Sequence, residues 1–201
     1  FLCTRDTSAE TLVGYCKKAD FVIHLAGVNR PQNPEEFAIG NTDFTRTLLE
    51  LLQKNGNHCP VLLSSSIQAG LTGRYAGSPY GQSKKVAEEL LLAYGEKTGA
   101  DGMIYRLPNL FGKWCRPNYN SVVATFCHHI ARDLPITVSD PAVELELVYI
   151  DDLIDEVLNA MEGHPNRTDG AYCSVPVSHP VTLGEIVRLL RTFREQPQTL
   201  L

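Results

Sequence analysis

The chain has 201 residues, of which 43% are hydrophobic and 20% charged, and its formal net charge at pH 7 is -5. This length and composition are typical of a globular protein with one well-buried core. The negative charge gives no electrostatic attraction to nucleic acid or to an anionic membrane. No apolar run in the sequence is long enough to cross a bilayer, and residues 1–5 do not resemble a signal peptide, so a cytoplasmic protein is expected.

The cysteines give no sign of a disulfide framework or a metal site. There are six of them, scattered along the chain without a Cys-x-x-Cys pair, a pattern typical of reduced thiols. Cys115 and Cys127 lie near a His-His pair at residues 128–129, but their spacing fits no zinc pattern. The sequence therefore predicts no metal site.

Strand-like and helix-like segments alternate along the chain. Strands are predicted at residues 1–4, 21–27, 61–66 and 102–107. Helices are predicted at residues 8–18, 34–54, 80–94, 121–131 and 181–194. The strands are continuous apolar runs, as in a sheet that is covered on both faces. This alternation predicts an α/β fold, with a parallel sheet and helices on both of its faces.

Residues 80–84 (Tyr-Gly-Gln-Ser-Lys) carry the most informative pattern for chemistry. Residues four apart lie on one face of a helix, so the Lys84 ammonium is expected beside the Tyr80 phenol. A nearby cation favours the phenolate, so the pattern predicts that Lys84 lowers the pKa of Tyr80. A tyrosine of this kind serves as a general acid or base on an alcohol or a carbonyl.

Small and polar residues follow three of the predicted strands. These clusters are residues 26–31, 64–66 and 108–113. Because ligands bind at the carboxyl ends of the strands in open parallel sheets, the three clusters and the Tyr80 helix predict one shared site.

The order of these motifs resembles the extended short-chain dehydrogenase/reductases, also known as the NAD-dependent epimerase/dehydratase family. The matching segments are residues 24–27 (His-Leu-Ala-Gly), 64–66, 80–84, 106–112 (Arg-Leu-Pro-Asn-Leu-Phe-Gly) and 148–152 (Val-Tyr-Ile-Asp-Asp). Within the family, residues 24–31, 64–69 and 108–127 are similar to the capsular polysaccharide assembly reductases of UDP-N-acetyl-L-fucosamine synthesis. The resemblance implies a Rossmann-like doubly wound sheet, a small C-terminal substrate subdomain and reduction of a keto group on a UDP-sugar by NAD(P)H.

The resemblance also assigns roles to individual residues. Tyr80 would deliver a proton to the carbonyl oxygen, Lys84 would support it, and Ser66 would orient the carbonyl, with Ser65 as the alternative. The implied cofactor-binding residues are Arg5, Leu25, Ala26, Gly27, Tyr80, Lys84 and Leu107. The implied substrate-binding residues are Asn29, Arg30, Asn109, Lys113, Arg116 and Asn118.

Three further residues have two interpretations each. Asn41 matches a helix asparagine that often supports the proton relay in this superfamily, or it faces solvent. Trp114 stacks on uracil or serves packing. Asn120 is interpreted as the cap of the helix at residues 121–131 rather than as a sugar ligand.

The sequence departs from the family in one respect, because none of its fifteen glycines forms the G-x-x-G-x-x-G turn that cradles the cofactor pyrophosphate. Residues 1–5 resemble the family's second strand with Arg5 at its tip, so the first βα unit is expected upstream of Phe1. Residues 1–110 are interpreted as the dinucleotide-binding part and 111–201 mainly as the substrate part. Arg5 suits a 2′-phosphate, which favours NADP over NAD, and a surface arginine without a ligand is the alternative.

Two other functions stay open besides the reductase. A nucleotide-sugar 4-epimerase shares nearly all the same residues and differs in keeping oxidised cofactor bound. A non-catalytic nucleotide-binding module is the third reading. A 4,6-dehydratase is disfavoured, because Ile67 and Gln68 stand where an acid and a base are needed. A homodimer is expected, since the superfamily commonly pairs long helices across a two-fold axis.

Overall fold

The computed structural model describes residues 1–33 and 35–199, with the side chains of the last helix described to residue 196. The chain forms two compact units, each with its own sheet. The first contains residues 1–107 and 164–174, and the second contains residues 108–163 and 175–201.

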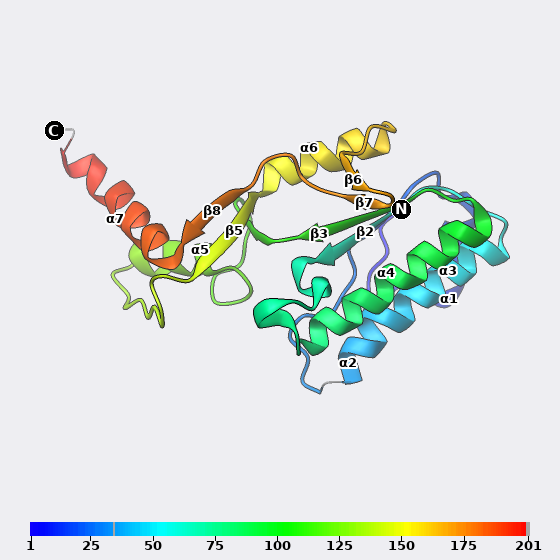
Figure 1. Ribbon diagram of the computed structural model, residues 1–201, viewed down its shortest axis with the longest axis horizontal. Coiled ribbons are helices and arrows are strands. Elements are labelled where there is room, and N and C mark those ends of the chain that lie inside the picture. The colour runs from blue at the N-terminus through cyan, green and yellow to red at the C-terminus, as the bar shows by residue number, and fades with distance from the viewer. Residues whose placement is uncertain (34, 200–201) are drawn as a thin grey trace. The chain divides into compact units, whose positions relative to one another are not determined.

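The first unit is built on a five-stranded sheet with the strand order β1-β2-β3-β7-β6. The bounds of these strands are Val22–His24 (β1), Val61–Ser66 (β2), Gly102–Leu107 (β3), Arg167–Asp169 (β6) and Tyr172–Cys173 (β7). Four of them run parallel, and β6 pairs antiparallel with β7 at the edge (Figure 1). The predicted α/β fold with a parallel sheet is confirmed, although β1 is shorter than expected.

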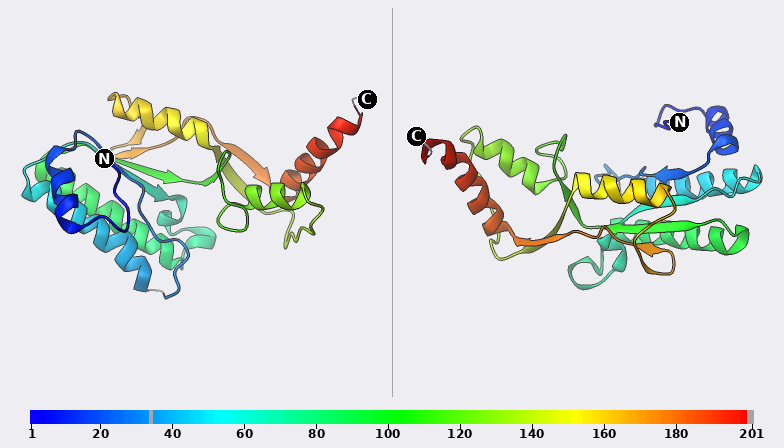
Figure 2. Two further views of the ribbon diagram at one scale, coloured as in Figure 1. Left: turned by 180° about the vertical axis from the view of Figure 1, so that it is seen from behind. Right: turned by 90° about the horizontal axis from the view of Figure 1, so that it is seen from above.

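The helices of this unit lie side by side along the sheet (Figures 1 and 2). Their bounds are Ala9–Lys18 (α1), Glu35–Phe37 (α2), Phe44–Lys54 (α3) and Pro79–Thr98 (α4), with short 3-10 turns at Ile67–Gly70 (η2) and Gly73–Tyr75 (η3). Helix α4 packs on β2 and β3, α3 packs on α4, and α1 packs on α3.

The core of the first unit explains why the sequences of its strands are continuous apolar runs. Val61 and Leu63 pack with Leu52 and Leu91 from the helices. Leu62 points to the opposite face of β2 and is also buried, with only 2% of its surface exposed. Both faces of this central strand are therefore covered.

Residues 1–4 form no strand, so that prediction is wrong. The segment makes no backbone ladder with β1 within the described chain, and Phe1 and Leu2 remain about four-fifths exposed at 80% and 81%. Phe1 instead stacks on Tyr15 of α1, with the ring centroids 4.7 Å apart. An apolar run becomes a strand only where a neighbouring strand supplies hydrogen bonds.

The helix predicted at residues 34–54 is present but contains a π-helical turn. Helix α2 continues into the π turn η1 (Ala38–Asp43), which continues into α3; Pro34 lies outside the described residues. The turn inserts one extra residue per turn into the helix and places Asn41 toward the interior, where it is 1% exposed. Single π turns of this kind are frequent at functional sites.

The second unit has a three-stranded sheet with the order β4-β5-β8. Its elements are Asn109–Phe111 (β4), Val122–Ile130 (α5), Glu144–Tyr149 (β5), Ile150–Met161 (α6), His179–Thr182 (β8) and Leu183–Thr199 (α7). β4 runs parallel to β5, and β8 runs antiparallel to it. Its core joins Phe126 of α5 and Leu147 of β5 to Ile186 and Val187 of α7.

Candidate active site

Helix α4 presents Tyr80 and Lys84 from its first turns. Ser78 caps the helix, because its Oγ accepts a hydrogen bond of 3.0 Å from the Gly81 N–H, and Pro79 occupies the first turn. Ser78 Oγ also donates to Oε1 of Gln68 at 2.9 Å, which ties the start of α4 to the turn η2. The start of the helix is thereby fixed against the end of β2.

The carboxyl ends of β2 and β3 are level, since Ser66 pairs with Leu107. β1 ends earlier, at His24, which pairs with Leu63. The loop after β1 therefore passes beside the serine tip of β2. This arrangement brings the predicted polar clusters at residues 26–31 and 64–66 to one edge of the sheet, as expected.

Lys84 is a buried cation, with 5% of its surface exposed. Its Nζ donates a hydrogen bond of 2.9 Å to the Ser64 carbonyl oxygen and lies 6.0 Å from the centroid of the Tyr80 ring. Burial lowers the pKa of Lys84 to about 8, and the Glu88 carboxylate opposes that change. Lys84 is therefore charged at neutral pH and loses its proton in mildly alkaline solution.

The electrostatic expectation for Tyr80 is wrong in direction. Burial raises the pKa of Tyr80, and hydrogen bonding from the Ser66 side chain opposes that rise. Lys84 does not dominate, because its ammonium lies over the ring and binds the Ser64 carbonyl, while burial penalises the phenolate. Tyr80 is held as the protonated phenol, which is the form of a proton donor.

The two candidate serines have different surroundings. Ser65 Oγ donates a hydrogen bond of 2.5 Å to Glu88. Ser66 is the serine that interacts with the phenol, and its Oγ also accepts from the Gln68 N–H at 3.2 Å. The geometry favours Ser66 over Ser65 as the partner of Tyr80.

Asn41 is buried, so the solvent-facing interpretation of this residue is wrong. Its side chain exchanges two hydrogen bonds with the backbone of Val28, at 2.7 Å and 2.9 Å, and donates a third, of 2.8 Å, to Ser83 of α4. Asn41 therefore clamps the loop after β1 against the helix that carries Tyr80 and Lys84.

Gly27 lies in the same corner of the site. A Cβ atom at this position would lie 2.8 Å from Asn41 Oδ1 and 3.0 Å from Lys84 Nζ. Only glycine lets the loop approach these two polar groups so closely.

A chain of buried hydrogen bonds links β1 to the π turn η1. His24 Nε2 lies 2.7 Å from Thr45 Oγ1, and that hydroxyl donates to the Asn41 carbonyl at 2.6 Å. Because the hydroxyl has a single proton, Nε2 of His24 must be the donor to Thr45. Burial, with the charge of Lys84 as a second cause, lowers the pKa of His24 to about 4, so the imidazole is neutral.

The other predicted cofactor residues lie at the surface. Leu25 is 67% exposed, Ala26 and Gly27 are exposed, and Leu107 is half-buried at the tip of β3. Arg5 lies in an exposed turn after residues 1–4. The predicted substrate residues Asn29 and Arg30 are exposed in the loop after β1.

The remaining substrate candidates belong to the second unit. Asn109 donates to the Glu146 carbonyl at 3.3 Å, and Asn118 accepts through Oδ1 from Nε2 of His129 at 3.1 Å. Arg116 is exposed. Lys113 forms an exposed ion pair of 2.6 Å with Asp151, a contact of the kind that a ligand anion displaces at little cost.

Two further expectations for this loop are wrong. Asn120 is not the cap of α5, because Ser121 Oγ accepts from the Ala124 N–H and fills that role. The packing interpretation of Trp114 is wrong: its side chain is 99% exposed, and its backbone has a left-handed φ of 65°. A bulky residue with this φ is under strain, which is often found at ligand-binding loops.

Sequence reasoning missed the carboxylate of Glu88, which is fully buried one turn after Lys84. The signal was present in the spacing, since residues 80, 84 and 88 share one face of a helix. Arg106, two residues before the polar cluster that follows β3, supplies its cationic partner at 2.6 Å.

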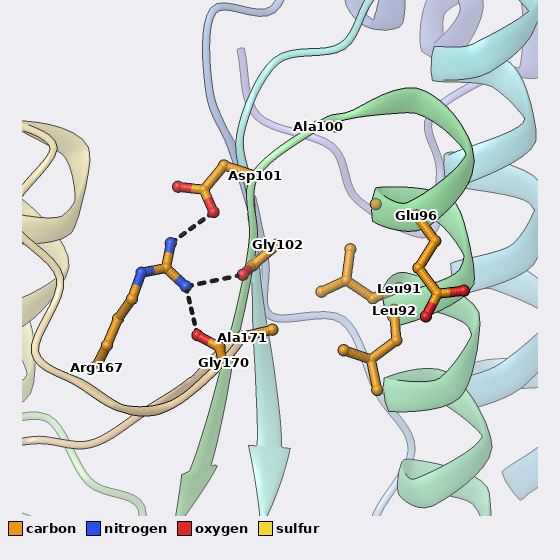
Figure 3. A pocket seen from close by; sticks show the side chains of 10 residues that line it. Leu91, Leu92, Glu96, Ala100, Asp101, Gly102, Arg167, Gly170 and Ala171 are labelled. Carbon is orange, nitrogen blue, oxygen red and sulfur yellow. Dashed lines mark hydrogen bonds and ion pairs between the residues drawn. The ribbon is translucent and has the colours of Figure 1, made fainter.

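A hollow of about 270 Å³ lies elsewhere in the first unit, at the amino end of β3 (Figure 3). Arg167 crosses its wall and donates to Asp101 at 2.5 Å and to the Gly170 carbonyl at 3.0 Å. Figure 3 draws no hydrogen bond or ion pair for the Glu96 carboxylate on the other wall. The catalytic candidates are at the opposite ends of the strands.

Residues 1–33 and 35–199 include no group of three or more potential metal-ligating side chains. Within the same ranges, no helix combines the length and the apolar character that a membrane span requires.

The chain is similar to several known proteins. The chain is 44% identical to the UDP-2-acetamido-2,6-beta-L-arabino-hexul-4-ose reductase of Pseudomonas aeruginosa over 98% of its length, covering 51% of that protein. It is 49% identical to the capsular polysaccharide assembling protein CapF from Staphylococcus aureus, with a TM-score of 0.81 over 95% of this chain and 50% of that one. The chain therefore spans about half the length of these relatives.

A more distant structural likeness supports the fold alone. The UDP-glucuronic acid 4-epimerase from Bacillus cereus is 20% identical, with a TM-score of 0.78 over 94% of this chain and 63% of that one. The model of the NAD dependent epimerase/dehydratase family matches residues 2–172, which is most of the sequence. The chain belongs to the NAD dependent epimerase/dehydratase family.

Proposed function

We propose that this protein is an NAD(P)H-dependent reductase of a keto group on a UDP-acetamido sugar, for the synthesis of a capsular or other surface polysaccharide. The observation that carries the proposal is the buried ammonium of Lys84 over the ring of a protonated Tyr80, with Ser66 beside the phenol. The similarity to the Pseudomonas reductase supports the substrate class.

The residues at this site fit the nicotinamide riboside end of a dinucleotide. An ammonium group has three donors, and within the described residues Lys84 uses one of them on the Ser64 carbonyl. The two others suit the hydroxyls of a ribose. Gly27 keeps the neighbouring loop free of a side chain at this corner. The pyrophosphate turn of the family has no counterpart in the sequence.

When bound, the reduced nicotinamide supplies a hydride to the carbonyl carbon of the sugar. The protein's part is to supply a proton. Tyr80 donates its phenolic proton to the carbonyl oxygen, so that the ketone becomes an alcohol and Tyr80 becomes a phenolate. Ser66 orients the carbonyl by hydrogen bonding, and the positive charge of Lys84 stabilises the phenolate until it regains a proton from solvent.

The same proposal includes the preferred cofactor and the residues that bind the cofactor and the substrate. NADP is favoured over NAD because Arg5 suits a 2′-phosphate, with Leu25, Ala26 and Leu107 as the surrounding cofactor residues. The sugar nucleotide would be bound by the substrate residues. These are Asn29, Arg30, Asn109, Lys113, Arg116 and Asn118. We also propose that the protein forms a homodimer.

A 4-epimerase remains the second candidate, because Tyr80, Lys84 and Ser66 serve both reactions. The two enzymes differ in the fate of the cofactor. We expect the purified full protein to carry no tightly held NAD in native mass spectrometry and to convert a UDP-2-acetamido-4-keto sugar to its 4-hydroxy product only when NADPH is added. Retained NAD, with interconversion of 4-hydroxy epimers and no need for added NADPH, would contradict the reductase and favour the epimerase.

A further inference from the structure

Glu88 is the most enclosed charged group described in the first unit, with no exposed surface. Its carboxylate accepts four hydrogen bonds. The donors are Ser65 Oγ at 2.5 Å, Arg106 Nε at 2.9 Å, Arg106 Nη2 at 2.6 Å and the Tyr172 hydroxyl at 3.2 Å. The two bonds from Arg106 form a bidentate pair, which is the strongest arrangement available to a carboxylate.

These contacts join α4 to three strands of the sheet. Ser65 comes from β2, Arg106 from β3 and Tyr172 from β7. A buried carboxylate satisfied by partners on three strands resists displacement, because moving it would leave several polar groups unpaired. Glu88 therefore holds one face of α4 in a fixed position against the sheet.

The same face of α4 carries the proposed catalytic residues. Tyr80, Lys84 and Glu88 follow one another at intervals of four residues, so they line one stripe of the helix. Each contacts one of three consecutive residues of β2. Tyr80 meets the side chain of Ser66, Lys84 binds the carbonyl of Ser64, and Glu88 binds the hydroxyl of Ser65. Fixing Ser65 also fixes the two residues beside it.

The charges around Lys84 come from few groups. His24 of β1 is neutral, Asn41 of η1 and Ser64 of β2 are uncharged, and Tyr80 of α4 is a protonated phenol. The carboxylate of Glu88 is the negative charge that favours the ammonium form of Lys84. Arg106 of β3 balances Glu88 in part through the ion pair.

We propose that Glu88 is a positioning residue for the active site: its carboxylate, held by Ser65, Arg106 and Tyr172, places a negative charge one turn after Lys84 and fixes β2 against the helix that carries Tyr80. This inference rests on the proposed function of Tyr80 and Lys84. Glu88 has no exposed surface, so it would act through Lys84 and Ser65 rather than by touching a ligand.

The test is a direct titration of Lys84 in the full protein by NMR of ¹³C-labelled lysine side chains. The resonance is assigned by its loss in Lys84→Met. In Glu88→Gln, which keeps the size of the side chain and removes its charge, we expect the midpoint of the Lys84 titration to fall by about one pH unit. Glu88→Asp keeps the charge and should return the midpoint most of the way to that of the wild type.

Tyr172→Phe is the matched control. It removes one hydrogen bond from Glu88 and leaves both charges of the ion pair, so the Lys84 midpoint should stay at the wild-type value. If Glu88→Gln does not fold, the double variant Glu88→Gln with Arg106→Gln replaces the buried ion pair with a neutral pair, and it should lower the midpoint in the same direction. An unchanged midpoint in the folded charge-removing variant, or an equal shift in Tyr172→Phe, would overturn the proposal.

The titration needs neither substrate nor turnover. A protein with no reductase activity whose Lys84 midpoint still falls in Glu88→Gln would refute the proposed function and leave the coupling intact. An active enzyme whose midpoint is unmoved would do the reverse. In an active enzyme, Glu88→Gln should also move the alkaline limb of the pH profile to lower pH, which a loss of stability alone would not do.

Discussion

Lys84 Nζ donates a hydrogen bond of 2.9 Å to the carbonyl oxygen of Ser64. This bond connects α4, which carries the proposed proton donor Tyr80, to β2. The acceptor is a backbone carbonyl of β2 rather than a serine side chain. A substitution of Ser64 leaves this acceptor in place, whereas a shift of α4 removes it. The consequences of this link can be measured.

The alkaline limb of the activity profile should belong to Lys84. Burial lowers the pKa of Lys84 to about 8 and raises that of Tyr80, so Lys84 loses its proton first as the pH rises. The neutral amine no longer stabilises the phenolate, and kcat/KM should fall above about pH 8. Lys84→Arg, which keeps its charge at all accessible pH values, should lack this limb even if its maximal rate is lower. A limb at the same pH in Lys84→Arg would assign it to another group.

His24 should make the protein sensitive to acid. Its pKa is about 4 in the folded protein against an ordinary value of 6.5, so between these values the unfolded chain binds the proton more readily. The contribution of His24 to stability is complete above pH 6.5 and is lost as the pH falls through about 4, which amounts to about 3 kcal/mol. Urea unfolding of wild type and His24→Gln at several pH values measures the difference. Parallel stability curves for the two proteins would contradict this assignment, and the exposed His164→Gln serves as the control.

Gly81 should not tolerate alanine, despite its position in a helix. A Cβ atom there would lie 2.3 Å from the Gln68 carbonyl oxygen, so α4 would have to move away from the turn η2. We expect Gly81→Ala to lose about 1–3 kcal/mol of unfolding free energy. Turnover should fall as well, because Tyr80 and Ser66 lie on the two sides of this contact.

The matched control is Gly14→Ala in α1, where a Cβ atom meets nothing within 4 Å. That variant should be neutral or stabilised by about 0.5–1 kcal/mol, because alanine favours the helix over glycine. Equal stability of the two alanine variants would show that the contact with Gln68 relaxes at no cost.

Arg5 tests the cofactor preference. If this guanidinium binds the 2′-phosphate, Arg5→Ala should weaken the binding of NADPH about tenfold or more and leave NADH almost unaffected. Calorimetry with both cofactors measures the two affinities. Equal losses for the two would remove Arg5 from the site.

The sequence predicted the elements that depend on local pattern. The apolar runs of β2 and β3 and the helix that begins near Tyr80 follow from residues that are neighbours in the chain. Residues 1–4 were misread, since an apolar run forms a strand only when another strand pairs with it. Asn120 was misread as a cap because Ser121, the adjacent residue, has the same capability.

The site was predicted in outline, and its electrostatics were not. The four-residue spacing of Tyr80 and Lys84 was sufficient to place them on one face. The direction of the change in the pKa of Tyr80 depends on burial, which the spacing does not encode. The same holds for Asn41, whose inward orientation comes from a π turn, and for Glu88, whose partners lie on three strands distant in sequence.

The most direct test of the central claim is a comparison of wild type with Tyr80→Phe in the oxidation of NADPH by a UDP-2-acetamido-4-keto sugar. The wild type should consume one NADPH per alcohol formed. Tyr80→Phe should bind NADPH within a few-fold of wild type but lose about 10²- to 10⁴-fold in turnover, because it lacks the proton donor. Wild-type turnover in Tyr80→Phe, or formation of product without consumption of NADPH by the wild type, would contradict the reductase mechanism.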